Sequence, residues 1–215
     1  MNSFLATIFS WWYTEDPKSW ISPEQYFDRP EKLLALFKKW NITSMFDAGC
    51  SHRHWMQHNR FAENGIVYSG GDVSTPAVEY CNQLWPELTI IHHDLTSDPF
   101  PAVDLIFSND VLIHLNNADK LSFLRNFLRS NANYLMLSHN GNHPHVESNI
   151  DVSYDYETAF PFAPVDWHAS PWNFPEELDL IVDADQEVGW KPRRLCLWSH
   201  AQIQSAVDQI DKNIK

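Results

Sequence analysis

Acidic side chains close several short apolar runs in the first half of the chain. Asp47, Asp72, Asp94 and Asp110 each end such a run. Ligands of an open parallel sheet bind outside the carboxyl ends of its strands, so these side chains are candidates for a binding site. An aspartate can also end a strand only because it favours turns, and it is the joint placement of the four that indicates a site.

The spacing of the first two aspartates indicates a nucleoside-containing ligand. Asp72 follows Asp47 by 25 residues, and an acidic residue after a second strand is the usual partner of ribose hydroxyls. A dinucleotide would also need a GxGxxG turn, but the loop after the first run has only Gly49. S-adenosylmethionine has no phosphate and carries a positive sulfonium that carboxylates attract. An adenosyl ligand is therefore favoured over a dinucleotide.

Alternating strands and helices must position these residues. Five strands are expected, at residues 45–47, 66–72, 88–94, 103–110 and 134–139, with helices at 74–84 and 119–129 between them. Further helices are expected before residue 44, from a capping box at 22–25 and an apolar face at 33–40, and after a second capping box at 199–202. This order predicts an α/β fold with a mostly parallel sheet and helices on both faces.

We expect one domain in four parts. Residues 1–43 form an N-terminal helical extension or lid, and 44–140 form the ligand-binding core. A Pro- and aromatic-rich insertion at 141–177 follows the fifth strand and is expected to cover the acceptor, because its large rings must pack against something. Residues 178–215 supply the closing strands and a C-terminal helix.

The chain resembles the small class I S-adenosylmethionine-dependent methyltransferases from Ser44 to about Trp198. The segments that carry the resemblance are Met45-Phe46-Asp47-Ala48-Gly49-Cys50, Tyr68-Ser69-Gly70-Gly71-Asp72-Val73-Ser74, His93-Asp94-Leu95-Thr96 and Asp104-Leu105-Ile106-Phe107-Ser108-Asn109-Asp110-Val111-Leu112-Ile113-His114-Leu115. The resemblance implies a Rossmann-like, seven-stranded sheet whose last strand is antiparallel, with 194–198 as the candidate for that strand. It also implies S-adenosylmethionine as the cofactor.

The resemblance implies roles for particular residues as well. The loop Asp47, Ala48, Gly49, Cys50 and Ser51 would wrap the methionine part of the cofactor; Asp72, followed by Val73, would bind the ribose; Asp94 with Leu95 would hold adenine; and Asn109 and Asp110 would lie beside the reactive methyl group. Ser51 stands where the family usually has a second glycine. The Asn/Asp-Pro-Pro-aromatic motif of amino-directed nucleic-acid methyltransferases is replaced by Asn109-Asp110-Val111-Leu112. Amino groups of nucleic-acid bases are therefore disfavoured as acceptors.

Transfer of a methyl group to oxygen needs a base that takes the hydroxyl proton, and histidine is best matched to neutral pH. His114 follows Asp110 by four residues, so on a helical turn both would face the same side, although His114 can equally be a packing residue. His139 ends the fifth strand, nearer the expected acceptor, and can equally be a solvated loop residue. Asp110, His114 and His139 are the catalytic candidates.

A metal ion is a weaker hypothesis for the same region. His139, His143 and His145 form an HxxxHxH pattern that could ligate a divalent ion together with Asp110 or Asp151. The intervening glycine, asparagine and proline predict a loop without a helix to align the ligands, so we expect no metal.

The aromatic residues bear on the acceptor. Trp167 and Trp172 of the insertion, with Asn140, are the candidate substrate-binding residues, because aromatic faces beside carboxylates and histidines suit sugars. Core packing is the alternative for most of the ten tryptophans. The sequence favours O-methylation of a small molecule or glycan, and the alternative is a protein of the same fold that binds the nucleoside or a partner without catalysis.

Composition excludes several classes. The formal charge of −13 disfavours nucleic-acid binding, since such a surface repels phosphate backbones. The apolar N-terminal stretch is too short for a membrane span and lacks preceding basic residues, so no signal peptide or anchor is expected. Three cysteines without paired spacing predict a reducing, cytoplasmic compartment. Oligomeric state has no signature in the sequence.

Overall fold

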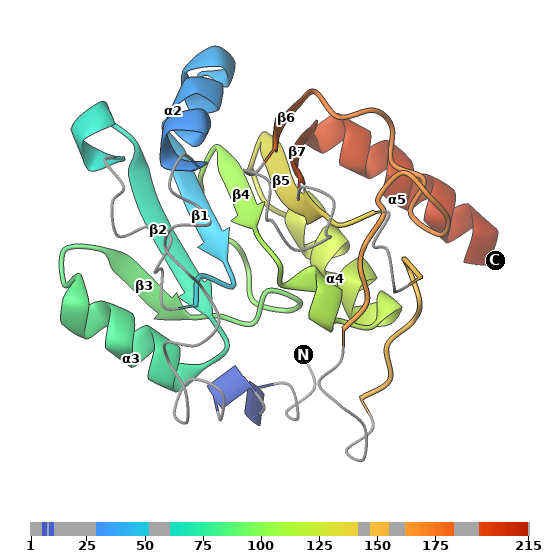
Figure 1. Ribbon diagram of the computed structural model, residues 1–215, viewed down its shortest axis with the longest axis horizontal. Coiled ribbons are helices and arrows are strands. Elements are labelled where there is room, and N and C mark those ends of the chain that lie inside the picture. Colours follow the sequence, from blue (N-terminus) through green and yellow to red (C-terminus); the bar gives the residue numbers. More distant parts are fainter. Residues whose placement is uncertain are drawn as a thin grey trace.

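A single seven-stranded sheet organises the chain (Figure 1). The computed structural model describes residues 6–7, 9–10, 29–51, 61–141, 147–154, 162–182 and 194–214. The strands are β1 (Ser44–Ala48), β2 (Val67–Asp72), β3 (Thr89–His92), β4 (Leu105–Ser108), β5 (Tyr134–His139), β6 (Asp179–Val182) and β7 (Arg194–Ser199). Their order is β3-β2-β1-β4-β5-β7-β6, and β7 runs antiparallel to the other six strands. The predicted fold class, including the antiparallel strand at residue 194, is confirmed.

Four longer helices are described, one before β1, two between strands and one after β7. They are α2 (Arg29–Trp40), α3 (Thr75–Leu84), α4 (Asn117–Leu128) and α5 (His200–Ile214), with short 3-10 turns η3 (Ala62–Asn64) and η4 (Leu112–His114). Residues 6–7 and 9–10 are also helical, whereas the capping box predicted at 22–25 lies outside the described residues. The capping box at α5 is present: Gln202 Oε1 accepts from Ser199 N–H at 2.9 Å, and Ser199 Oγ accepts from Gln202 N–H at 3.3 Å.

Two apolar clusters cover the two faces of the sheet. Side chains alternate along β4, so Leu105 and Phe107 pack with residues of α2 and α3, whereas Ile106 packs with residues of α4 and α5. Strands buried on both faces are typical of parallel sheets. The sheet is therefore a rigid base, and its carboxyl edge is free to carry loops.

The segment between β5 and β6 crosses the carboxyl ends of β4 and β5. Asn140 N–H, just after β5, donates to Val165 O at 2.9 Å, and Ala163 N–H donates to Ile113 O, just after β4, at 2.9 Å. The described parts of this segment, at 140–141, 147–154 and 162–178, contain no helix. Instead α5 packs beside α4 and against β5 and β7 (Figure 1).

None of the helices described here has the length and apolar character that crossing a bilayer requires.

Candidate active site

The loop after β1 is tied to β2 through its backbone. Gly49 N–H and Cys50 N–H both donate to Gly71 O, at 2.8 and 3.1 Å. Gly49 has a φ of +87°, and a Cβ added there would lie 2.4 Å from Val111 Cγ2. Both features require glycine. Ser51, where the similar family has a second glycine, also has a positive φ of 49°, so the loop keeps a glycine-like conformation at that position.

Asp72 lies at the carboxyl end of β2 and is held by the same loop. Its Oδ2 accepts from Ser51 N–H at 2.9 Å, and its Oδ1 accepts from Ser74 N–H, at the start of α3, also at 2.9 Å. Burial raises the pKa of Asp72, and the hydrogen bonds from the two N–H groups partly oppose that shift. Each carboxylate oxygen keeps a second lone pair for another donor. The structure thus brings Asp72, with Val73 beside it, against the loop of residues 47–51.

The other two aspartates on this side have local partners. Asp47 is 2% exposed, and its Oδ2 accepts from the hydroxyl of Tyr68 at 2.8 Å. Asp94 Oδ1 accepts from the N–H and the hydroxyl of Thr96, at 2.9 and 2.6 Å, which is the turn role that aspartates at strand ends favour. Leu95 is buried in the core. The predicted contacts of these residues with adenine and methionine stay predictions.

The ends of β4 and β5 are joined through Asp110. This residue has a positive φ of 55°, its N–H donates to Ser138 Oγ at 2.9 Å, and its Oδ1 accepts from Asn140 Nδ2 at 3.2 Å. Asn109 Oδ1 and Asn140 Oδ1 are both buried without a hydrogen-bond partner. Buried acceptor oxygens are normally satisfied, so these two are candidates to receive donors from a ligand.

His114 does not share a helical face with Asp110. The turn η4 begins at Leu112, after the left-handed backbone at Asp110, so the four-residue helical spacing assumed from the sequence does not apply. The His114 ring lies 5.9 Å from the Phe9 ring and 6.2 Å from the Phe162 ring, between centroids. This environment fits the packing alternative.

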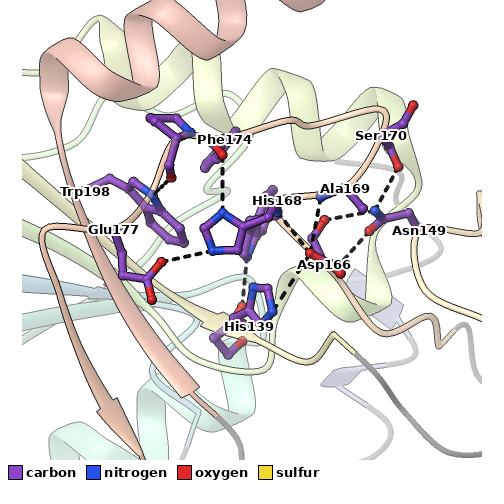
Figure 2. A network of polar contacts seen from close by, with 12 residues as sticks. His139, Asn149, Asp166, His168, Ala169, Ser170, Phe174, Glu177 and Trp198 are labelled. Carbon is purple, nitrogen blue, oxygen red and sulfur yellow. Dashed lines mark hydrogen bonds and ion pairs between the residues drawn. The ribbon is translucent and has the colours of Figure 1, made fainter.

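His139 ends β5 in a buried polar network (Figure 2). The side chain is 7% exposed, its Nε2 lies 3.9 Å from Asp166 Oδ1, and its Nδ1 is buried without a hydrogen-bond partner. Asp166 is fixed in turn, because its Oδ1 also accepts from the N–H groups of His168 and Ala169. Burial lowers the pKa of His139, and the charge of Asp166 opposes that shift. A neutral imidazole with one unengaged nitrogen is the form that a general base needs.

Three residues of this network were not found from the sequence. Asp166, His168 and Glu177 all come from the segment after β5, and His168 Nε2 lies 2.9 Å from Glu177 Oε2. No fixed spacing connects them to His139. The sequence contains one local indication of these residues: Asp166 and His168 are polar and flank Trp167 in a segment otherwise rich in proline and apolar rings.

Trp167 and Trp172 belong to the core. Trp167 is 0% and Trp172 2% exposed, their ring centroids are 5.4 Å apart, and Trp167 Nε1 donates to Ser138 O at 2.9 Å. No ring face is open to a ligand in this arrangement. The predicted stacking of these rings on an acceptor therefore does not fit their position. Instead, the two rings pack the segment between β5 and β6 against the sheet.

Metal ligation has no support among the described residues. No group of three or more His, Cys, Asp and Glu side chains in that part of the chain could hold an ion. His143 and His145 lie outside the described residues.

Comparison with known proteins identifies the fold. No protein-family model and no curated protein sequence matches the chain. Magnesium protoporphyrin IX methyltransferase from Synechocystis PCC 6803, solved with bound SAH, is similar with a TM-score of 0.61 and 15% identity over 90% of this chain and 98% of that one. An O-methyltransferase from a Brevibacillus brevis trans-AT PKS, in complex with S-adenosyl-L-homocysteine, gives 0.53 and 17% identity over 88% and 81%.

A third similar structure has a different acceptor. Phosphoethanolamine N-methyltransferase 1 from Haemonchus contortus, in complex with phosphoethanolamine and S-adenosylhomocysteine, gives a TM-score of 0.51 and 15% identity over 76% of this chain and 37% of that one. Because the acceptors of these enzymes differ, the shared architecture does not determine which acceptor a member uses. The strand order and these likenesses together show that the chain has the fold of the class I S-adenosylmethionine-dependent methyltransferases.

Proposed function

We propose that the protein is an S-adenosylmethionine-dependent methyltransferase. The observation that carries this proposal is the arrangement at the ends of β1 and β2, where backbone N–H groups of the glycine loop donate to Gly71 O and to the carboxylate of the buried Asp72. Asp72 would hold the ribose hydroxyls, the loop of residues 47–51 would wrap the methionine part, and the unpartnered Asn109 Oδ1 would accept from a donor of the ligand. When bound, the cofactor supplies an electrophilic methyl group on a positively charged sulfur.

The acceptor proposed is a small hydroxylated molecule, such as a sugar. Two features at the end of β5 support a hydroxyl: the unpartnered oxygen of Asn140 can accept a hydrogen bond from it, and the unpartnered Nδ1 of His139 can accept its proton. The acidic chain also favours a neutral acceptor over a phosphorylated one.

His139 acts as the general base in this proposal. Its Nε2 faces Asp166, which favours the tautomer with the proton on Nε2 and leaves the lone pair on Nδ1. As the hydroxyl oxygen forms its bond to the methyl carbon and the carbon–sulfur bond breaks, Nδ1 takes the hydroxyl proton. The carboxylate of Asp166 then stabilises the positive charge on the ring.

The cytoplasm is the proposed location. The three cysteines, Cys50, Cys81 and Cys196, are buried free thiols, which fits a reducing compartment.

A protein of the same fold that binds the nucleoside or a partner without catalysis is the second candidate. It shares the cofactor site, so binding alone does not separate the two. The His139 ring, with its Nε2 facing Asp166 and its Nδ1 buried without a partner, favours the enzyme, because a binding protein has no need of a neutral base.

Binding and turnover should be measured in sequence. S-adenosylmethionine and its demethylated product should raise the melting temperature and NAD should not, since a ligand of the native state alone stabilises it. Equal stabilisation by NAD, or none by either adenosyl compound, would contradict the cofactor assignment. Labelled cofactor incubated with a panel of glycans, small phenols and peptides should then give a methylated hydroxyl compound. Binding without a product on the panel would favour the non-catalytic candidate.

A further inference from the structure

A second histidine–carboxylate pair lies directly beside His139 (Figure 2). The ring centroids of His139 and His168 are 5.2 Å apart. His168 Nε2 lies 2.9 Å from Glu177 Oε2, and His168 Nδ1 lies 3.2 Å from the backbone oxygen of Phe174. His168 and Glu177 have no part in the proton transfer proposed for His139 and Asp166.

The partners of His168 define its charge. A carboxylate oxygen and a carbonyl oxygen can only accept hydrogen bonds, so both ring nitrogens of His168 must donate. Only the imidazolium form has a proton on each nitrogen. The side chain is 35% exposed and that of Glu177 is 11% exposed, so the pair stands between solvent and the buried His139.

A fixed cation at this position opposes protonation of His139. Four charged groups face the His139 ring: Asp166, His168 and Glu177 from the segment after β5, and Arg194, its register partner on β7. The carboxylates favour the protonated ring, whereas His168 and Arg194 disfavour it. Burial acts in the same direction as the two cations and has the largest effect on the pKa of His139.

We propose that the His168–Glu177 ion pair is a positioning element that keeps the His139 ring neutral and aimed at the acceptor. Glu177 holds His168 in its cationic form, and His168 acts on His139 through its charge, without touching the substrate. This inference rests on the proposed role of His139 as the base. It adds two residues to the site, and the charge of His168 adds to burial in keeping a base that lies near a carboxylate unprotonated.

Substitutions at His168 separate charge from packing. His168→Gln removes the cation, whereas His168→Lys keeps a positive charge on a flexible chain. We expect His168→Gln to raise the pKa of His139 by roughly 0.5 to 2 units, which NMR titration of the ring measures. The lower value corresponds to one charge at about 5 Å under strong screening by solvent, and the upper value to the same charge under weak screening. His168→Lys should keep the wild-type value within a few tenths of a unit.

Activity gives the second measurement. In the pH profile of kcat/KM, the acid limb of His168→Gln should move upward by the same amount as the NMR midpoint, with affinity for the cofactor unchanged. An unchanged His139 midpoint in His168→Gln, or an equal shift in His168→Lys, would overturn the proposal. A shifted midpoint in a protein without methyltransferase activity would uphold the electrostatic coupling and reject the proposed function instead.

The wild-type protein offers a test that needs no variant. Nitrogen chemical shifts of the His168 ring at pH 7 should be those of a doubly protonated imidazolium. A neutral His168 ring would overturn the inference even if the substituted proteins failed to fold.

Discussion

The two halves of the candidate site are built in different ways. On the cofactor side, at the ends of β1 and β2, backbone N–H groups of the turn donate to the strand end beside it, as in Gly49 N–H to Gly71 O and Ser51 N–H to the Asp72 carboxylate. On the acceptor side, side chains meet from β5 and from the segment after it, as in His139 with Asp166 and His168 with Glu177. The geometry of the cofactor side therefore follows from the sheet topology. The geometry of the acceptor side depends on how the long segment between β5 and β6 packs against the sheet.

The cofactor side uses features common to proteins of this topology, whereas the acceptor side uses features particular to this chain. Loops between strands and helices can place a nucleoside site in any protein of this topology. The acceptor side includes the unpartnered buried atoms His139 Nδ1, Asn140 Oδ1 and Trp172 Nε1, at positions that the sheet alone does not fix. We therefore expect substitutions on the acceptor side to change turnover and substitutions on the cofactor side to change affinity or stability.

The largest effect is expected at the base. His139→Ala should lower kcat about a hundredfold or more, because it removes the proposed acceptor of the hydroxyl proton, while cofactor affinity stays the same. The wild-type acid limb should lie below the usual histidine value of about 6.5, since burial lowers the pKa of His139. Steady-state kinetics between pH 5 and 8 with an accepted hydroxyl substrate provide the measurement.

His114→Phe is the matched control for that experiment. It keeps an aromatic ring between Phe9 and Phe162, so the acid limb should not move. Full turnover in His139→Ala would mean that no general base is needed and that holding the two substrates close together accounts for catalysis. Loss of the acid limb in His114→Phe would transfer the role of base to His114.

The glycine of the cofactor loop should show the next largest effect. Gly49→Ala combines a φ of +87° with a Cβ 2.4 Å from Val111 Cγ2, so it should destabilise the fold by about 2 to 3 kcal/mol in urea unfolding. Gly65→Ala has a similar φ of +73° but no atom within 4 Å of the new Cβ. It should cost only about 1 kcal/mol, and equal costs at the two positions would show that the contact with Val111 relaxes freely.

The sequence predicted the cofactor side more fully than the acceptor side, for a physical reason. Strand ends, turn glycines and capping residues act over a few positions, so Gly49, Asp72 and the strand at 194 could be placed from local pattern. The network at His139 joins positions 139, 166, 168 and 177 through the path of a segment without regular structure, which has no period. The same reason left two alternatives for Trp167 and Trp172, acceptor binding and core packing: both lie in a loop by sequence, and the fold buries both.

A substitution of Asp72 tests directly whether this residue contributes to binding of S-adenosylmethionine. Asp72→Ala should weaken binding of S-adenosylmethionine by about 1 to 3 kcal/mol, because it removes a charged acceptor from the ribose hydroxyls. Asp208→Ala, an exposed carboxylate on α5, removes the same charge away from the site and should leave affinity unchanged. Calorimetry of the folded variants measures both, and equal affinities in the two would remove Asp72 from the site.

The smallest expected effect compares one buried histidine from each side. Burial lowers the pKa of both His93, near the end of β3, and His139. Below about pH 6.5 each of these histidines then binds a proton more readily in the unfolded chain than in the folded protein. The free energy of unfolding therefore falls on acidification, by at most about 1.4 kcal/mol per pH unit for each histidine.

His139→Gln and His93→Gln should each make this loss of stability smaller between pH 6.5 and 5.5, and the double variant should show the sum. Urea unfolding at the two pH values measures the slope. A slope unchanged by His139→Gln would mean that this ring protonates as readily in the folded protein as in the unfolded chain, and the acceptor side would then lack the neutral base on which its proposed chemistry depends.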